Sequence, residues 1–504
     1  MTATSATSDS PVRQGTAMGW TQSDRFVLLV LLALAALRSL ALFISPLELG
    51  VDEAQYWLWS TGFDFGYYTK PPLTSWIIGL SHSLFGHHEW AVRLPAAWLH
   101  FGTALVLWRS ATWLAGPETG PLAGRLAALL WMTLPTVALG SFVMSTDTPL
   151  LFCWSAGLTA LVGVVTGRLP QTRGMAFAGA GFGAAMLSKY AAIYGLFGIC
   201  LFALVIRRDS SPVTLRGMMM FLAGMVLLAS PNIIWNLANE LTTVRHLGDN
   251  ANLERQSYSL ANSLGFLGAQ FATAGPLVFA LMLGVMRARR DDAGGMLMLC
   301  LSAPVILVIM IQAFLSEANA NWALAAMPAL VLWLAHWLAA GRARLARVSI
   351  GINLALSALL LAVTMAGTLG PLTPKSDPFR RLRGWQPLAT DVAAAMQSHA
   401  ASTVIADRRA TAALLSWHFY KKNVAGQDIS VLVVDEDGRP SNHFEQNLAW
   451  QPAPGRRVIL LDGRKIPPQL DGVTWQAGTP PLSQTQISQK RTRTLYIHLG
   501  VEGG

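Results

Sequence analysis

The sequence predicts a mainly α-helical, polytopic membrane protein with a smaller C-terminal α/β domain, and three observations lead to this fold class. Of the 504 residues, 53% are hydrophobic and only 13% are charged, whereas about a quarter of the residues of a soluble domain are charged. Apolar segments of about 20 residues, the length that spans a bilayer as a helix, recur along the first 370 residues. Beyond that point the composition becomes mixed and polar.

The apolar segments predict about 11 to 13 transmembrane helices of the kind that spans a bilayer. The expected spans are 26–45, 91–115, 122–141, 148–166, 174–188, 190–206, 217–236, 263–286, 296–315, 321–340 and 348–369. The stretch 174–206 fits either two tightly joined helices or one long kinked helix. The apolar segment 74–88 is short and contains three histidines, so we interpret it as an interfacial or re-entrant helix, with part of a further span as the alternative.

The basic residues orient the bundle. The net charge is +10, but the positive residues lie in short clusters between apolar segments, which indicates membrane topology and not nucleic-acid binding. With a cytoplasmic N-terminus, 13 arginines fall in inner loops: Arg109, Arg125, Arg168, Arg173, Arg207, Arg208, Arg216, Arg287, Arg289, Arg290, Arg342, Arg344 and Arg347. Five basic residues fall in outer loops: Lys70, Arg93, Lys189, Arg245 and Arg255. This bias places the C-terminal tail outside, whereas an even number of spans would place it inside.

The chain divides into three expected regions. A Ser/Thr-rich tail, 1–24, is expected to be cytoplasmic and disordered. Residues 25–370 form the membrane region, with a first outer loop over 46–90, and residues 371–504 form an α/β domain of common size. Within that domain we expect short buried strands and intervening helices. The strands are 402–407, 429–434 and 457–462, and the helices are 386–400 and 408–420.

Asp52 and Glu53 directly follow the first span. Charge at the edge of a bilayer is costly and is commonly functional. One interpretation is that these carboxylates only cap the helix expected over 53–60, since Asp is a good N-cap residue. The other is that one of them is a catalytic general base, which must lie within hydrogen-bond reach of the hydroxyl that it activates, or that it holds a cation.

The same outer loop continues with Tyr67, Tyr68 and Lys70, followed by two prolines. Tyr and Lys are common anchors at a membrane interface. The functional interpretation is that Lys70 binds a phosphate and the tyrosines position an acceptor. The prolines would stiffen the loop, because each fixes φ and removes a backbone donor.

Asp147 and Lys189 lie at the outer ends of later spans. Asp147 precedes Thr148 and Pro149, a pattern typical of a helix start, so a capping role and a site role are equally open. Lys189 interrupts an apolar stretch, where an unpaired lysine costs a few kcal/mol, and the functional interpretation leads here. A cation at this place suits a polyprenyl phosphate head group.

Further candidates lie in two more outer loops. Arg245 follows the apolar segment 217–236, and Asn321 and Trp322 open the segment 321–340. The asparagine is as suitable for capping a helix as for binding a sugar, and Trp is ordinary at an interface. The ten histidines form no zinc-ligand spacing. A divalent cation between Asp52 and Asp147 is conceivable from their chemistry alone, so no cofactor is assigned.

These motifs together resemble the GT-C membrane glycosyltransferases. The set consists of Asp52-Glu53 after the first span, Tyr67-Tyr68-Thr69-Lys70-Pro71-Pro72, Thr146-Asp147, Leu187-Ser188-Lys189 and Asn321-Trp322. It is similar to the branch shared by protein O-mannosyltransferases and the bacterial lipid A aminoarabinose and galacturonic acid transferases. The resemblance covers roughly residues 25–340. It departs from the aminoarabinose transferases at Thr69, where those enzymes carry an acidic residue.

The resemblance implies an inverting glycosyltransferase of the bacterial inner membrane, with its active site and C-terminal domain on the periplasmic side. Its donor would be a polyprenyl-phosphate-linked sugar, and its acceptor a glycolipid such as lipid A or lipopolysaccharide, or a protein. Asp52 would activate the acceptor hydroxyl. Lys70 and Lys189, with Arg245 as a further candidate, would neutralise the departing phosphate, which is often the largest catalytic effect.

Two other classes of function compete with this one. A transporter or flippase for a lipid-linked sugar would also need charged residues in the membrane, but the sequence shows no inverted repeat, and the charges gather at one face. A scaffold whose function resides in the C-terminal domain would leave the outer-face charges unexplained. If the chain is a transferase, transfer to protein Ser or Thr residues is the alternative to a glycolipid acceptor.

Overall fold

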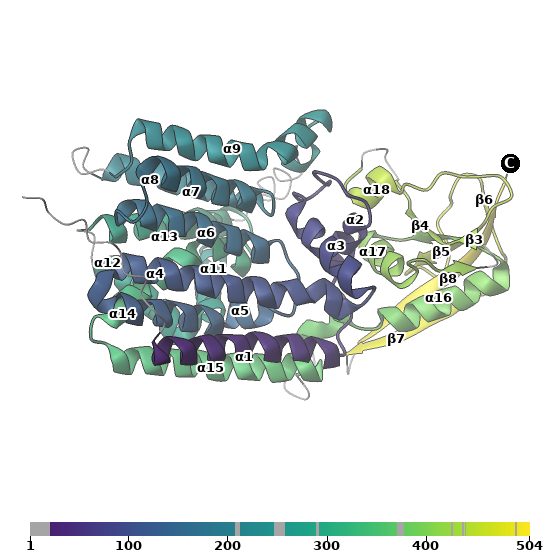
Figure 1. Ribbon diagram of the computed structural model, residues 1–504. Coiled ribbons are helices and arrows are strands. Elements are labelled where there is room, and N and C mark those ends of the chain that lie inside the picture. Colours follow the sequence, from purple (N-terminus) through teal and green to yellow (C-terminus); the bar gives the residue numbers. More distant parts are fainter. Residues whose placement is uncertain are drawn as a thin grey trace, which may run out of the picture.

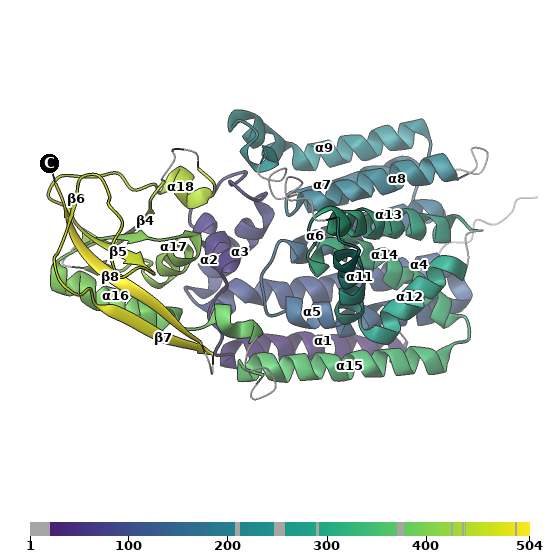
Figure 2. The same cartoon turned by 180° about the vertical axis from the view of Figure 1, so that it is seen from behind.

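The computed structural model describes residues 21–206, 212–245, 258–288, 292–369, 377–424, 427–435, 438, 440–488 and 491–503. Long helices lie side by side in an elongated bundle, and a strand-containing domain stands at one end of it (Figure 1). The view from behind shows the same two parts, with the short helices of the first outer loop between them (Figure 2). Arg255, Arg207, Arg208, Arg289 and Arg290, which entered the charge count, lie outside the described residues.

Each predicted span falls on a helix or on a pair of consecutive helices. The bundle consists of α1 (Gln22–Ile44), α4 (Glu89–Thr133), α5 (Pro135–Gly140), α6 (Asp147–Val165), α7 (Gln171–Met186), α8 (Ile193–Val205), α9 (Leu215–Ala238), α11 (Leu260–Ala274), α12 (Pro276–Ala288), α13 (Ala293–Leu315), α14 (Met327–Ala339) and α15 (Ala343–Ala366). Short 3₁₀ turns, Tyr190–Ala192 and Ala320–Ala326, precede α8 and α14. The stretch 174–206 is thus two helices.

Among the described residues, six helices are long and apolar enough to cross a membrane individually, or seven if one bent pair counts as a span. This is fewer than the 11 to 13 spans predicted, because several spans are short or interrupted. Helix α4 bends at Gly116, whose φ is +75°. Helices α7 and α8 have only 16 and 13 residues. The multi-pass membrane architecture itself is confirmed.

Two predicted boundaries are wrong. The tail was expected to reach residue 24, but Thr21 caps α1 and forms a capping box with Asp24, which satisfies backbone donors of the first turn. The segment 263–286 was expected to be one span, but α11 and α12 meet at an angle of 113°. The bend lies at Gly275, where φ is +89° and a side chain would collide with Asn353. A glycine therefore permits this bend.

The first outer loop contains α2 (Val51–Ser60) and α3 (Leu73–Phe85). Both helices lie between the bundle and the C-terminal domain (Figure 1). Helix α3 packs against α4, and α2 packs against α17 (Arg409–His418) of the C-terminal domain. The predicted interfacial segment 74–88 is therefore a short helix beneath that domain and not a further span.

The C-terminal domain is a six-stranded mixed sheet with helices. Its strands are β1 (Thr403–Ala406), β4 (Ser430–Val433), β5 (Arg457–Asp462), β6 (Val473–Trp475), β7 (Leu482–Ser488) and β8 (Arg491–Glu502). The order is β4-β1-β5-β8-β6, with β7 also paired to β8. Strands β4, β1 and β5 are parallel and coincide with the three apolar runs of the sequence, whereas the antiparallel strands β6 to β8 were not predicted.

Two helices of this domain connect it to the first outer loop. Helix α16 (Trp385–His399) and α17 match the predicted helices. The backbone NH groups of Trp385 and Gln386 donate to the Glu48 carboxylate over 2.8 and 2.7 Å, so a residue of the first outer loop caps α16. A separate pair, β2 (Asn423–Val424) and β3 (Gln427–Asp428), completes the strands.

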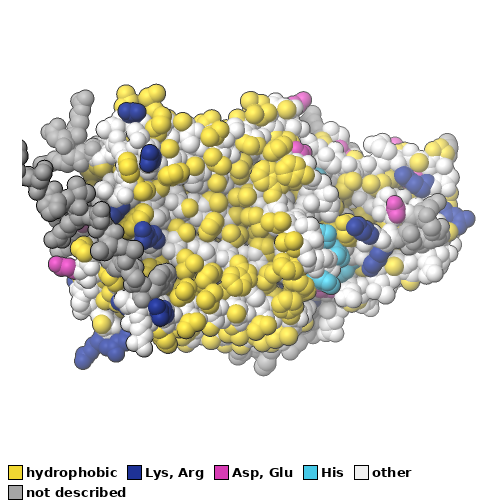
Figure 3. Space-filling model, viewed as in Figure 1, with side chains coloured by type: hydrophobic (Ala, Val, Ile, Leu, Met, Phe, Trp, Pro, Cys, Tyr) yellow, Lys and Arg dark blue, Asp and Glu magenta, His cyan; other side chains and the backbone are white. Residues whose placement is uncertain are grey.

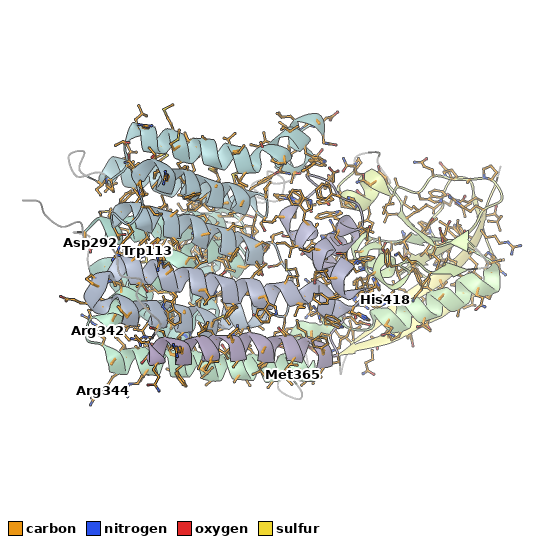
Figure 4. All side chains as sticks on the ribbon, in the orientation of Figure 1. Trp113, Asp292, Arg342, Arg344, Met365 and His418 are labelled. Atoms are coloured by element: carbon orange, nitrogen blue, oxygen red, sulfur yellow. The ribbon has the colours of Figure 1, made fainter. Side chains whose placement is uncertain are left out.

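The surface of the bundle reflects its apolar composition. Hydrophobic side chains cover the middle of the face in Figure 3, and Lys and Arg side chains gather at the end remote from the C-terminal domain. Arg342 and Arg344 lie at that remote end, and His418 lies at the junction with the C-terminal domain (Figure 4). Histidine side chains are visible at the same junction (Figure 3).

Candidate active site

Three connections of the bundle meet beneath the first outer loop. The backbone NH of Leu73 donates to the carbonyl of Leu187 over 2.8 Å. The Ser188 hydroxyl donates to the carbonyl of Thr146 over 2.6 Å and lies 3.3 Å from the Thr74 hydroxyl. The loop after Lys70, the break between α7 and α8 and the start of α6 are therefore held together.

The network at the centre of this junction joins three of the predicted site residues. Lys189 Nζ lies 2.7 Å from Asp147 Oδ1, and Asn321 Nδ2 donates to Asp147 Oδ2 over 2.8 Å. The three side chains come from α6, the α7–α8 break and the turn before α14. Asp147 therefore fixes the position of the Lys189 ammonium, and the two charged side chains are mostly buried.

Lys70 is a half-buried cation beside this network. In the part of the chain that the structure describes, its ammonium forms no hydrogen bond or ion pair. The pKa of Lys70 is lowered, first by burial and then by the charges of Lys189 and Arg409, and Asp52 and Asp147 offset part of this shift. A negative charge beside a lysine favours its charged form.

Asp52 lies in the first turn of α2 and faces the C-terminal domain. Its side chain is 66% exposed and is ion-paired with Arg409 of α17. The Arg409 guanidinium also donates to the side-chain oxygen of Gln55. The candidate base is therefore open to solvent on one side and bound to a cation of the other domain.

Glu53 has a different environment from its neighbour. It accepts hydrogen bonds from Arg93 over 2.9 and 2.8 Å, from the Gly50 NH over 2.9 Å and from the Met144 NH over 3.1 Å. Only 1% of the residue is exposed. The prediction that Glu53 is catalytic is therefore revised: its carboxylate is buried and fully hydrogen-bonded, and it connects α2, α4 and the start of α6.

The two predicted tyrosines shape the loop. The Tyr67 ring stacks on Trp59 at 4.7 Å between centroids, and its hydroxyl donates to the Trp59 carbonyl over 3.0 Å. The Tyr68 hydroxyl donates to the carbonyl of Pro440 in the C-terminal domain over 2.5 Å. These contacts hold the loop in place, and the role in acceptor positioning stays a prediction.

Two other predicted residues, Arg245 and Trp322, take no part in the hydrogen bonds to Asp147. Arg245 is 68% exposed and pairs with Glu240 at 3.5 Å. Trp322 is half-buried and packs against the core of the bundle. Their predicted roles in phosphate binding and substrate positioning therefore rest on the sequence alone.

The described residues provide no set of ligands for a metal ion between Asp52 and Asp147. Among the described residues, no group of three or more His, Cys, Asp or Glu side chains is placed to hold a metal ion. Asp147 is engaged by Lys189 and Asn321, and Asp52 by Arg409. Both carboxylates therefore already have hydrogen-bond or ion-pair partners within the protein.

Sequence reasoning missed the arginines of the C-terminal domain. A cleft of about 670 Å³ lies between α2 and that domain, with Asp52 in its wall. Five arginines line the cleft: Arg380, Arg381, Arg408, Arg409 and Arg493. The paired arginines at 380–381 and 408–409 were a usable signal, because they break the positive-inside bias in a domain that is expected on the outer face.

Aromatic and histidine side chains close the junction between the loop and the C-terminal domain. The His87 ring stacks on Trp417 at 3.8 Å and lies edge-on to Trp57 at 5.1 Å. His418, at the same junction (Figure 4), and His443 are both half-buried. Burial lowers the pKa of each to about 4, so both are neutral at pH 7.

Comparison with known proteins identifies similar chains. Residues 69–235 match the model of the dolichyl-phosphate-mannose-protein mannosyltransferase family. The chain is 34% identical over 457 residues to the lipid A galacturonosyltransferase RgtD of Rhizobium johnstonii, and the match covers 88% of this chain and 92% of the relative.

Solved structures share the fold. ArnT of Cupriavidus metallidurans, bound to undecaprenyl phosphate, superposes with a TM-score of 0.62 at 13% identity, and the match covers 94% of this chain and 97% of the other. The arabinofuranosyltransferase AftD from Mycobacteria gives a TM-score of 0.51 at 14% identity, with 94% of this chain and 40% of the other covered.

Proposed function

The chain belongs to the GT-C superfamily of membrane glycosyltransferases, and on that premise we propose that it transfers a sugar from a polyprenyl-phosphate donor to lipid A or a related envelope glycolipid. The activity for which the relative RgtD is named supports lipid A as the acceptor class and a hexuronic acid as the sugar. The ligand of ArnT supports a polyprenyl phosphate carrier. The arginine bias of the loops supports an inner-membrane enzyme whose site faces the periplasm.

The observation that carries the proposal is the position of Lys70. Its half-buried side chain has no hydrogen-bond or ion-pair partner among the described residues, and the charges of Lys189 and Asp52 act on its pKa. Two cations and one exposed carboxylate are what glycosyl transfer from a lipid phosphate requires. The cations bind the leaving group, and the carboxylate accepts a proton.

The reaction follows from these positions. Asp52 accepts the proton of an acceptor hydroxyl, whose oxygen forms a bond to the anomeric carbon as the bond from that carbon to the phosphate oxygen breaks. Attack from the side opposite the phosphate inverts the anomeric centre. General-base assistance of this kind contributes about 10²- to 10⁴-fold.

Lys70 and Lys189 stabilise the negative charge that develops on the departing polyprenyl phosphate. Asp147 and Asn321 are positioning residues: Asp147 holds Lys189, Asn321 holds Asp147, and neither needs to touch the substrate. Fixed charges at a leaving group act without reorganisation during the reaction, which makes them effective. Arg245 remains a further candidate for the phosphate on the basis of its outer loop alone.

Mass spectrometry of envelope lipids tests the proposal. Lipids are compared from cells with the intact chain, without it, and with Asp52→Asn. We expect a sugar mass increment on lipid A with the intact chain alone, because the amide that replaces the Asp52 carboxylate cannot take the proton. Asp64→Asn is the matched control: Asp64 lies in the same outer loop, and its carboxylate accepts a hydrogen bond from the neighbouring Phe65 NH.

The outcomes separate the competing functions. An increment that persists with Asp52→Asn removes Asp52 as the base. Identical lipid A in all cells, with lipid-linked sugar accumulating in one leaflet of the deletion strain, would establish transport in place of transfer. A sugar on protein Ser or Thr residues would move the acceptor to protein.

A further inference from the structure

The cleft between α2 and the C-terminal domain concentrates positive charge around Asp52. Its volume is about 670 Å³, and its wall contains five arginines, all supplied by the C-terminal domain. Asp52 and Glu53 also line the cleft, so its arginines outnumber its carboxylates by five to two, and an excess of one sign of charge attracts ligands of the opposite sign. Lys70 and Lys189 do not line this cleft, although the charges of Asp52 and Arg409, which do, act on Lys70.

The arginines of the cleft differ in how they are engaged. Arg408 pairs with Asp407 at 2.6 Å. Arg493 lies over the ring of Trp385 at 3.5 Å and donates to the carbonyl of Arg383 over 3.0 Å. These contacts fix the two guanidinium groups at the wall.

Arg380 and Arg381 are available to a ligand. Within the described parts of the chain, neither guanidinium forms a hydrogen bond or an ion pair. Arg381 is exposed and Arg380 is half-buried. Guanidinium groups bind phosphate and carboxylate in two-pronged geometry, and two adjacent free ones point to an anionic ligand.

Arg409 connects this cleft to the candidate base. It is the arginine that pairs with Asp52, while its other hydrogen bond goes to Gln55. The ion pair occupies one oxygen of the Asp52 carboxylate and holds this side chain against α17. A second anion in the cleft would compete for the same guanidinium and release the carboxylate.

We propose that the cleft binds a phosphate or carboxylate group on the saccharide of the acceptor lipid. When the acceptor binds, the Arg409 guanidinium breaks its ion pair with Asp52 and forms one with that anion. The inference rests on the proposed glycosyl transfer. It adds an acceptor subsite in the C-terminal domain and a device by which Asp52 becomes active only when an acceptor is present. Without an acceptor, Arg409 keeps Asp52 from activating water, which would hydrolyse the donor.

Equilibrium binding to the intact protein in nanodiscs tests the subsite without requiring turnover. The probes are bisphosphorylated lipid A, the same lipid with both phosphates removed, a lipid A in which a uronic acid supplies the only negative charge, and inorganic phosphate. We expect both acidic lipids to bind at least tenfold more tightly than the neutral one. Inorganic phosphate should compete only at much higher concentration.

The variant for the binding test is Arg380→Ala/Arg381→Ala. We expect it to weaken binding of the acidic lipids about tenfold and to leave the neutral lipid unchanged. The matched control is Arg344→Ala/Arg457→Ala, which removes the same charge outside the cleft: Arg344 lies at the opposite end of the bundle (Figure 4), and Arg457 contacts the carbonyl of His399.

Several binding results would overturn the subsite. These are equal affinity for acidic and neutral lipids, an equal effect of the control variant, or inorganic phosphate binding as tightly as the lipid. Acidic-lipid binding that depends on Arg380 and Arg381 in a protein without transfer activity would retain the subsite and reject only the proposed function.

Donor hydrolysis without acceptor tests the role of Arg409. In this side reaction water forms the bond to the anomeric carbon, the bond to phosphate breaks, and Asp52 takes the proton. We expect Arg409→Gln to raise this hydrolysis severalfold and Arg409→Lys to restore the low rate. Unchanged hydrolysis in Arg409→Gln would reject the restraint on Asp52.

Discussion

Glu53 and Arg93 form a two-pronged ion pair in which both side chains are at least 96% buried, with nitrogen–oxygen distances of 2.9 and 2.8 Å. Arg93 also donates to the carbonyls of Leu47 and Glu48, each over 2.8 Å. The pair therefore ties the first outer loop to α4. Glu53 and its neighbour Asp52 have opposite environments, because one carboxylate is enclosed and the other is open to solvent.

The Glu53–Arg93 pair predicts a stability effect that depends on leaving a charge unpaired. Glu53→Ala should lower the free energy of unfolding by about 3–5 kcal/mol, since it leaves the Arg93 guanidinium buried without its partner. The double change Glu53→Gln/Arg93→Met should cost much less. Thermal unfolding in detergent measures both, with the exposed Glu118→Ala as control. Equal losses for the single and double changes would show that the ion pair is not the cause.

Gly66 lies where the first outer loop approaches α9 too tightly for a side chain to fit. A Cβ at Gly66 would lie 2.3 Å from the ring of Trp235 and 2.8 Å from Asn232, and an indole ring cannot yield easily. Gly66→Ala should therefore displace the loop and reduce transfer at least tenfold, since displacements of about 1 Å in a site can cost 10²-fold. Gly62→Ala is the control, because a Cβ at Gly62 would have no neighbour within 4 Å. Equal activity of the two variants would contradict this close approach of the loop to α9.

The sequence predicted the parts of the site that lie in local motifs. Lys70, Asp147 and Lys189 were found because each is a charge next to an apolar segment, where unpaired charge is costly. Their meeting point was not predictable from spacing, because it depends on how the α7–α8 break packs under the loop.

Contacts between residues far apart in the chain account for what the sequence did not reveal. Glu53 and Asp52 are adjacent and chemically alike, so only their partners, Arg93 and Arg409, separate them. Arg409 lies 357 residues from Asp52 in the chain. The antiparallel strands β6 to β8 were likewise missed, because their long-range pairing and polar residues give no buried apolar run.

Half-buried histidines predict that the C-terminal domain is less stable in acid. Burial holds the pKa of His418 and His443 at about 4 in the folded protein, against 6.5 for the ordinary group. Above pH 6.5 both states are neutral and the full stability is present. As the pH falls from 6.5 to 4, the unfolded chain binds protons that the folded chain does not, so stability falls by up to about 3 kcal/mol per residue.

Thermal unfolding between pH 7.5 and pH 5 measures this acid sensitivity. His418→Phe should reduce the loss of Tm on acidification, because the phenyl ring takes no proton. Glu89 raises the pKa of His418, whereas Lys422 and His87 lower it, so each is kept intact. The exposed His88→Gln is the control. An unchanged pH dependence in His418→Phe would reject this explanation.

Lys189 predicts a selective effect on use of the donor. Lys189→Ala removes a cation that Asp147 holds at 2.7 Å, and a hydrogen bond to a charged group contributes about 1.5–3 kcal/mol. The KM for the polyprenyl-phosphate donor should rise about ten- to hundredfold, while the KM for the acceptor stays constant.

Asp147→Asn should act in the same direction, and the double variant should be less than additive, because both changes affect one ammonium. The exposed Lys422→Ala is the control for charge. Additive effects of Lys189→Ala and Asp147→Asn would mean that Asp147 has its own contact with substrate, and an unchanged donor KM in Lys189→Ala would make the pair purely structural.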